Sequence, residues 1–414
     1  MDSSRLAGLF KCNKCGSCTS VCPLYQHTVF EGMAARGKLA LLESLADGKP
    51  LPPKAVRGML ENCLLCGACA QNCPSFVPTT DLFLTARAEL MGELGLPLPI
   101  RLLLKSLASP GVLAAGMPAA HVAQRIGLQA VAEQLGPLLP ETVRAALRVA
   151  PPVPARPFRS RPLPQTNGAA RGTVAYFAGC FMNWGYADAA EATCLTLSKA
   201  GYQVEAPPVV CCGVPHRAYG DLDAARSLAR QNVEALERYE AIVADCASCG
   251  AALKEYTHLL AEDPAWRDRA AQVSARTADV SEFLVRQGFE RPRGVLSLRV
   301  TLHDPCHLVR GQGVKAQPRE LLRAIPGVEL VEMEGADVCC GSAGSFCVTH
   351  PDLGEAVGST KAGNILATGA AAVASGCPSC LSQLRAVLRA KGATMRVVHP
   401  VELLAQSYRS TPGR

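Results

Sequence analysis

The feature that most constrains this chain is a cysteine run that occurs twice near its N-terminus, as CNKCGSCTSVCP over 12–23 and CLLCGACAQNCP over 63–74. Both copies have the spacing C-x2-C-x2-C-x3-C-P. In this spacing three neighbouring thiolates bind three corners of one [4Fe-4S] cluster, and the fourth binds the other cluster of a pair. Two copies therefore predict two [4Fe-4S] clusters that exchange their fourth ligands.

Each predicted cluster takes three cysteines from one run and the last cysteine of the other. The first set is Cys12, Cys15, Cys18 and Cys73, and the second is Cys63, Cys66, Cys69 and Cys22. Structural zinc also uses C-x2-C pairs, but a four-ligand zinc site leaves the third cysteine of each run unexplained. Gly16 and Gly67 allow the backbone to turn tightly within each run.

The segments around the two runs have helical patterns. Apolar residues recur at helical spacing over 35–48, and a second helix is predicted over 79–95 with a cap at Thr80 or Asp81. We therefore expect an all-α ferredoxin-like domain over 1–90. Residues 91–172 read as a helical connector without cysteine, which we expect to pack within the chain, followed by a Pro- and Arg-rich linker.

The remaining residues alternate predicted strands with predicted helices, which favours an α/β fold. The strands are expected over 173–179, 241–246, 296–304 and 371–377, and the helices over 188–201, 223–239 and 353–369. Cysteines and the segments VSEFL and PVELL recur in the same order in both halves. An internal repeat of this kind predicts two related lobes, 173–290 and 291–414.

Each lobe contains a CCG motif and three further cysteines. The sets are Cys180, Cys211, Cys212, Cys246 and Cys249 in the first lobe, and Cys306, Cys339, Cys340, Cys377 and Cys380 in the second. Adjacent cysteines point in different directions, which suits a multi-iron cluster better than one tetrahedral ion. Zinc or a redox-active dithiol is the alternative. Cys194 lies in a helical apolar pattern and Cys347 lies outside the repeat, so both are interpreted as buried thiols.

Polar residues accompany the cysteines of both lobes. His303, Asp304, His307 and Arg310 surround Cys306, and Lys254 follows Cys249. Such side chains donate hydrogen bonds to a cluster, relay protons or bind an anionic group, so we treat these five as candidate cofactor-binding residues. For any one of these residues the alternative is a purely structural role, in which the side chain caps the end of a strand.

The overall composition excludes several classes of protein. A chain of 414 residues with 20 cysteines, many of them in C-x-x-C groups, and no apolar leader fits metal binding in a reducing cytosol better than disulfides. No apolar run reaches the roughly 18 residues that cross a bilayer. The formal charge of +7 is not concentrated in a polybasic tract, so no nucleic-acid partner is expected.

The order of these motifs resembles the iron–sulfur subunit of glycolate oxidase and of related FAD-linked D-lactate dehydrogenases. The resemblance covers nearly the whole chain, and its most specific stretches are VVCCGVPHRAYGD, LKEYTHLL, DVCCGSAGSF and the segment that begins HDPCHLVRGQG. It implies a multidomain chain in which an all-α ferredoxin-like domain precedes a duplicated α/β CCG (cysteine-rich) domain.

The resemblance also implies partners and a location. A separate FAD-binding subunit oxidises the 2-hydroxyacid, and this chain passes electrons towards a quinone or another membrane-associated acceptor. FAD is expected only in the partner, in agreement with the absence of a G-x-G-x-x-G run here. We expect a cytoplasmic protein, peripheral at the inner face of the membrane.

The complete five-cysteine sets leave a second interpretation open. They resemble the CCG subunit of heterodisulfide reductase, which implies one or two further clusters, of noncubane [4Fe-4S] type, and a thiol–disulfide reductase activity. A zinc scaffold without redox function is a third class. The iron–sulfur subunit of succinate dehydrogenase is a weaker match, because only eleven residues precede Cys12 here.

Overall fold

The computed structural model describes residues 6, 8–129, 131, 136–166 and 168–410. Around the two cysteine runs the described regular elements are helical. They are η2 (Leu9–Lys11), α1 (Ser17–Ser20), α2 (Pro23–Thr28), η3 (Glu31–Met33), α3 (Ala35–Ala46), α4 (Pro53–Glu61), α5 (Ala68–Gln71) and α6 (Thr79–Leu94). Their apolar faces meet in one core that includes Leu42, Leu60 and Phe83.

The two helices predicted in this region form as α3 and α6, but the predicted cap of α6 is wrong. The helix begins at Thr79 and its N-cap is Pro78. The Thr79 hydroxyl lies 3.0 Å from the sulfur of Cys69, so this residue contacts the second cysteine run.

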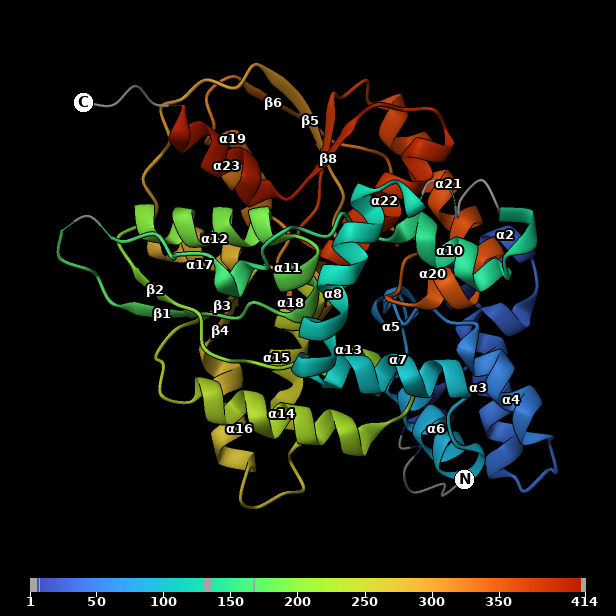
Figure 1. Ribbon diagram of the computed structural model, residues 1–414. Coiled ribbons are helices and arrows are strands. Elements are labelled where there is room, and N and C mark those ends of the chain that lie inside the picture. The colour runs from blue at the N-terminus through green and yellow to red at the C-terminus, as the bar shows by residue number, and fades with distance from the viewer. Residues whose placement is uncertain (1–5, 7, 130, 132–135, 167, 411–414) are drawn as a thin grey trace.

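The connector forms α7 (Leu98–Ala108), α8 (Pro110–Arg125), η4 (Gly136–Leu138) and α10 (Glu141–Val149). In Figure 1, α7 and α8 lie on the face turned to the viewer, between the N-terminal helices and the lobes. No single described helix is long and apolar enough to cross a membrane, whereas α7 and α8, bent by 101° at their junction, pass that test together by length and composition.

The segment predicted as a linker is attached to the first lobe. It contains η5 (Phe158–Ser160), and Phe158 is buried in the core of that lobe. The rings of Phe158 and Tyr176 pack edge to face with their centroids 5.2 Å apart. An apolar side chain therefore holds this part of the segment on the sheet.

The rest of the chain forms two four-stranded parallel sheets with the same strand order (Figure 1). The first sheet has the order β2-β1-β3-β4 and the second β6-β5-β7-β8. The strands are β1 (Thr173–Tyr176), β2 (Gln203–Glu205), β3 (Ile242–Ala244), β4 (Thr277–Asp279), β5 (Leu298–Leu302), β6 (Val328–Val331), β7 (Ala372–Ala374) and β8 (Arg396–Val398). The identical order agrees with the repeat seen in the sequence.

Helices connect and cover the strands of both lobes. In the first lobe they are α11 (Cys180–Trp184), α12 (Ala187–Lys199), α13 (Val214–Ala218), α14 (Leu222–Leu236), α15 (Ala247–Leu259), α16 (Arg267–Arg276) and α17 (Val280–Gln287). In the second they are α18 (Cys306–Gln312), α19 (Gln317–Arg323), α20 (Phe346–Thr349), α21 (Pro351–Ala367), α22 (Pro378–Ala390) and α23 (Pro400–Arg409). The repeated segments VSEFL and PVELL begin α17 and α23, and both helices start with a capping box.

Candidate metal centres

The eight cysteines of the N-terminal runs line two neighbouring cavities. One cavity is lined by Cys22, Cys63, Cys66 and Cys69. The other is lined by Cys12, Cys15, Cys18 and Cys73, and Cys69 also reaches it. The structure thus brings together the same two groups of four that the spacing of the runs predicts as ligand sets. Thiolates converging on a small cavity are the donor set of a [4Fe-4S] cluster, so the residues fit this cofactor.

Both runs have the same backbone conformation. Gly16 and Gly67 adopt left-handed φ values of 83° and 73°, and each precedes a short helix. Lys14 and Leu65, two positions earlier, also have positive φ values, of 60° and 50°. Non-glycine residues seldom adopt this conformation, and it persists where the surrounding structure requires it. The repeated strain indicates that both loops are shaped to point several cysteines in one direction.

A buried cation accompanies the cavity lined by Cys22, Cys63, Cys66 and Cys69. Lys38 is fully buried on α3, lines the cavity and donates through Nζ to the carbonyls of Gly32 and Met33, each at 2.7 Å. Burial lowers the pKa of Lys38, while the neighbouring Cys63 and Cys22 oppose this shift. A positive charge here offsets the negative charge of cluster-bound thiolates.

In the lobes, the cysteines lie where strands end and helices begin. Cys180 and Cys306 are the first residues of α11 and α18, and Cys246 and Cys377 are the N-caps of α15 and α22. These are the carboxyl ends of parallel strands, where α/β folds bind ligands, and helix N-termini there stabilise negative charge. The α/β topology therefore collects five thiols at one edge of each sheet.

The ten lobe cysteines form one continuous series in which each thiol shifts the pKa of the next. The series runs through Cys180, Cys211, Cys212, Cys249, Cys246, Cys377, Cys380, Cys340, Cys339 and Cys306. The link between the lobes is the pair Cys246 and Cys377. Interaction with the thiols of Cys246 and Cys380 lowers the pKa of Cys377 well below its usual range. A low pKa favours the thiolate, which is the metal-binding form.

The second lobe also contacts the N-terminal domain beside its cysteines. Cys339 belongs to a small apolar cluster with Leu24 and Leu64, against which Cys22 and Cys66 pack. Burial raises the pKa of Cys66 well above its usual range, and the nearby Cys339 raises it further. The cavity that Cys66 lines is thus adjacent to the cysteines of the second lobe.

Arg310 and Lys254, two of the candidate cofactor-binding residues, make different contacts. Arg310 donates through Nε to Gln71 Oε1 at 2.9 Å and through a guanidinium nitrogen to the Asp337 carbonyl at 2.8 Å, so it joins the second cysteine run to the second lobe. Lys254 pairs with Glu282 at 2.8 Å, and no described contact joins it to a cysteine sulfur.

Asp304 and His307 are also held by protein partners. Asp304 is buried and accepts two hydrogen bonds from Arg319, each at 2.9 Å. The His307 ring nitrogen Nδ1 lies 2.8 Å from the Ser248 hydroxyl of the first lobe, and burial lowers the pKa of this ring.

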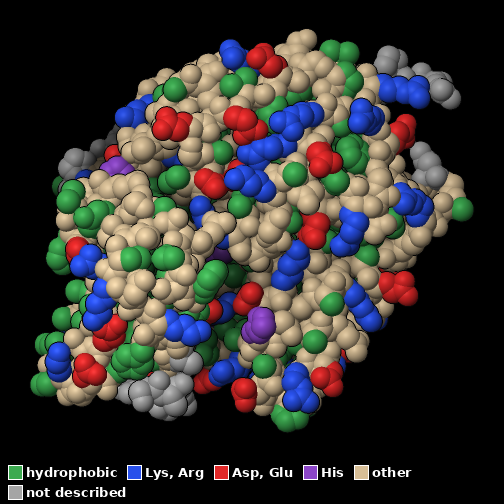
Figure 2. Space-filling model, turned by 180° about the vertical axis from the view of Figure 1, so that it is seen from behind, with side chains coloured by type: hydrophobic (Ala, Val, Ile, Leu, Met, Phe, Trp, Pro, Cys, Tyr) green, Lys and Arg blue, Asp and Glu red, His purple; other side chains and the backbone are tan. Residues whose placement is uncertain are grey.

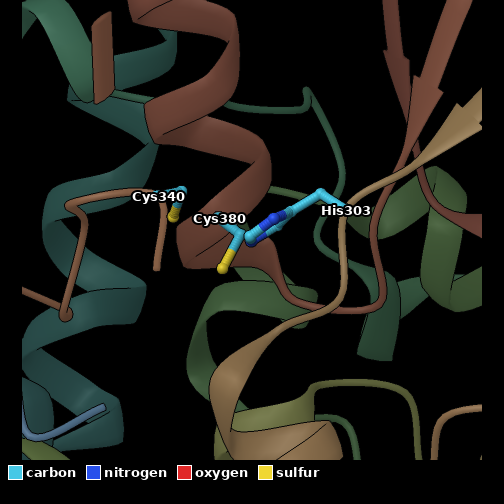
Figure 3. Close-up of side chains that lie close together, drawn as sticks. All are labelled: His303, Cys340 and Cys380. Atoms are coloured by element: carbon cyan, nitrogen blue, oxygen red, sulfur yellow. The ribbon is translucent and has the colours of Figure 1, made fainter. Parts of the chain in front are cut away.

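His303 differs from the other candidates because neither of its ring nitrogens has a hydrogen-bond partner, although the residue is fully buried. Nitrogen and sulfur atoms of His303, Cys340 and Cys380 all lie within 4.8 Å of one another. Figure 3 shows the imidazole pointing towards the two thiols. Burial lowers the pKa of His303 to about 3, so the ring is neutral near pH 7.

Cys194 and Cys347 are outside the series of ten lobe cysteines. Cys194 is fully buried in α12, and Cys347 is buried at the start of α20 with its sulfur 3.7 Å from the Gly344 carbonyl. Both positions agree with the interpretation as core thiols.

Two more cations lie beside the lobe cysteines, and neither was predicted from the sequence. Lys361 is buried on α21 next to Cys340 and Cys339, and its ammonium donates to the Gly335 carbonyl. Arg159, from the segment after the connector, lies near Cys180 and donates to the Ala178 carbonyl at 2.9 Å. Each lobe therefore has a cation beside its cysteines, as the cavity around Lys38 does.

Two family models match this chain. The model of a 4Fe-4S dicluster domain matches residues 8–77, and that of a cysteine-rich domain matches residues 174–254 and 300–385. Together with the convergent thiols, these matches define an iron–sulfur protein with an N-terminal dicluster domain and a duplicated cysteine-rich domain.

Several curated proteins are similar to the chain over most of its length. The probable glycolate oxidase iron–sulfur subunit of Bacillus subtilis is 33% identical over 96% of this chain and 94% of its own length. The glycolate oxidase iron–sulfur subunit of Escherichia coli is 30% identical, over 84% and 83%. One of the subunits of the fumarate reductase (CoM/CoB) from Methanothermobacter marburgensis is 30% identical, over 98% and 73%. The chain belongs to the family of the glycolate oxidase iron–sulfur subunits.

Proposed function

We propose that this chain is the electron-transfer subunit of a 2-hydroxyacid dehydrogenase complex that oxidises D-lactate or glycolate on a separate FAD-binding subunit. The family supports this role. The observation that carries it is the unbroken succession of cysteines from the two N-terminal cavities to the far end of the first lobe. Clusters bound there supply one-electron redox chemistry, and a quinone or another acceptor receives the electrons.

The ligand sets are part of this proposal. The two N-terminal groups of four cysteines each hold one [4Fe-4S] cluster, and the five cysteines of each lobe hold one further cluster, of the noncubane type. The buried Lys38 and Lys361 offset the charge of the thiolates, and Arg310 keeps the second run against the second lobe.

The decisive experiment compares the chain purified anaerobically with and without its flavoprotein partner. Only the complex should reduce an artificial acceptor when D-lactate or glycolate is added. Hydroxyacid oxidation by the isolated chain would contradict the proposal. Iron and labile-sulfide analysis of the same sample separates it from a zinc scaffold, which would contain zinc and no sulfide.

A second candidate function is thiol–disulfide reduction. It is favoured by the complete cysteine sets, whose thiols meet between the lobes at Cys246 and Cys377. Incubation of the reduced protein with low-molecular-weight disulfides tests it, and failure to form thiols would remove this candidate.

We also propose that the connector places the protein at a membrane surface. Helices α7 and α8 expose several large apolar side chains, although α7 packs on the first lobe through the buried Leu104. These exposed side chains are Leu98, Leu102, Leu103, Val112 and Val122. Every charged residue between Gly95 and Val131 is basic. Apolar helices with only basic charges bind anionic lipid surfaces.

The face seen from behind has a different distribution of charge. Figure 2 shows Lys and Arg side chains interspersed with Asp and Glu over the face seen from behind. Mixed charges suit ordinary solvation better than binding to an anionic surface.

A further inference from the structure

His303 occupies a position at which the two lobes differ. It is the first residue after β5, three residues before Cys306, and its counterpart Phe177 follows β1, three residues before Cys180. The two backbones have the same pairing: Phe177 N–H donates to the carbonyl of Val243 at 2.8 Å, and His303 N–H to that of Ala374 at 2.9 Å. Only the side chain has changed, from a hydrocarbon ring to one with two polar nitrogens.

The surroundings of His303 do not satisfy those nitrogens. The side chain is 0% exposed, and both Nδ1 and Nε2 are without hydrogen bonds. The Ala336 carbonyl lies close enough to act on the ring as an acceptor and to oppose the lowering of its pKa, but it is outside hydrogen-bond geometry. It already accepts from the backbone N–H of Asp304 at 3.0 Å and from Lys361 Nζ at 3.4 Å. An unpaired buried polar group costs about 1–3 kcal/mol, and here two lie in one ring.

The ring of His303 faces sulfur. One of its nitrogens lies within 4.8 Å of the sulfurs of both Cys340 and Cys380, and Figure 3 shows the ring pointing towards these two thiols. Neutral imidazole binds iron through its unprotonated nitrogen and leaves the other nitrogen as an N–H donor, which suits a sulfur acceptor. Histidine replaces cysteine on one iron of Rieske clusters, so an imidazole is an established ligand of iron–sulfur centres.

We propose that His303 is a nitrogen ligand to iron of the cluster held by the second lobe, which makes that centre a mixed cysteine–histidine site, whereas the first lobe has cysteine ligands only. The inference rests on the proposed function in one respect, namely that the second lobe holds a cluster. It implies that the two centres differ chemically, with the second shifted to higher reduction potential, because an imidazole added to the five cysteines brings a neutral nitrogen ligand that the first centre lacks.

The test is pulsed EPR on the anaerobically purified full chain, grown once with natural histidine and once with 15N-labelled histidine. A nitrogen bonded to iron gives a strong hyperfine coupling that changes with the isotope. We expect this coupling in the wild type and its complete loss in His303→Phe, which installs the residue of the first lobe. Labelling needs no substitution, so the wild-type result stands even if the variant folds poorly.

The controls separate this inference from the proposed function. His307→Phe removes another histidine near the lobe cysteines and should retain the strong coupling. Iron and sulfide analysis of each sample shows whether the second lobe holds a cluster, with Cys339→Ser and Cys340→Ser as the reference for its loss. A filled second lobe without strong histidine coupling would overturn the ligand assignment alone. An iron-free second lobe would overturn both proposals.

Discussion

The thiol of Cys246, which follows β3 in the first lobe, interacts with the thiol of Cys377, which follows β7 in the second, and this interaction raises the pKa of Cys246 and lowers that of Cys377. Centres held by the two lobes are therefore neighbours, and their unpaired electrons should interact. Replacing Cys211 and Cys212 by serine should remove the iron of one centre and the magnetic splitting of the other. EPR and iron analysis check both effects.

Cys194→Ser is the matched control for this experiment, because that thiol is buried in the same lobe but lies outside the series of sulfurs. It should retain the iron and the splitting. An unchanged iron content after loss of Cys211 and Cys212 would contradict a centre in the first lobe.

Lys38 is expected to tune the centre in the cavity that it lines. Lys38→Met removes a buried positive charge beside Cys22 and Cys63. This destabilises the reduced cluster more than the oxidised one, because the reduced cluster is more negative. At an effective dielectric constant of about 20 the loss is on the order of 1–2 kcal/mol, so the reduction potential should fall by several tens of millivolts. A redox titration followed by EPR measures it.

Lys49→Met serves as the control for Lys38, since Lys49 is exposed at the end of α3 and water screens its charge. The reduction potential of the cluster in Lys49→Met should match that of the wild type. Equal potentials in both variants would show that Lys38 has no electrostatic role.

Arg310 is expected to hold the N-terminal domain against the second lobe. Arg310→Ala loses the hydrogen bond to Gln71 and the one to the Asp337 carbonyl, which together contribute about 1–3 kcal/mol. Cluster content should stay constant, while stopped-flow reduction of the lobe centres by the reduced flavoprotein slows.

The comparison for Arg310 is Lys315→Ala. Arg310 and Lys315 both form an ion pair with Asp337, but Lys315 has no described contact with the N-terminal domain. Its stopped-flow rate should equal that of the wild type. The same slowing in both variants would point to Asp337, not to the domain contact.

The connector should bind anionic lipid. Leu102→Glu places a negative charge on the exposed apolar face of α7, where 56% of Leu102 is accessible. Burying one leucine contributes about 1.5–3 kcal/mol, so binding of the full chain to phosphatidylserine-containing vesicles should weaken at least about tenfold.

Val295→Glu makes the same kind of change at a residue that is 65% exposed before β5, far along the chain from the connector. Co-sedimentation should show wild-type binding for this variant. Equal binding by the wild type, Leu102→Glu and Val295→Glu would contradict the proposal that the connector binds a membrane surface.

Much of the fold is readable from the sequence because its signals are local. The two runs, the repeat of CCG motifs and the helices α3, α12 and α14 follow from spacing and apolar periodicity. The strands β2, β4, β6 and β8 escape prediction because they have only three or four residues and include polar ones such as Gln203 and Arg396. Only pairing to β1, β3, β5 and β7 makes them strands.

The cations near the cysteines escape prediction for a different reason. Lys38 shares a helix face with the buried Ala35 and Leu42, and Lys361 shares one with the buried Val357 and Ile365. A lysine on an apolar helix face is a visible signal, but periodicity alone does not say what it faces. That depends on packing between segments far apart in the chain.

The anchoring of Phe158 against Tyr176 has a consequence for how the partner must approach. Some redox proteins carry electrons on a domain that swings on a loose tether between donor and acceptor. Here the segment that leaves the connector is fastened to the first sheet, and Arg310 fastens the second cysteine run to the second lobe. In the proposed complex these two contacts hold the carrier in place, so we expect donor and acceptor to dock at separate places on its surface.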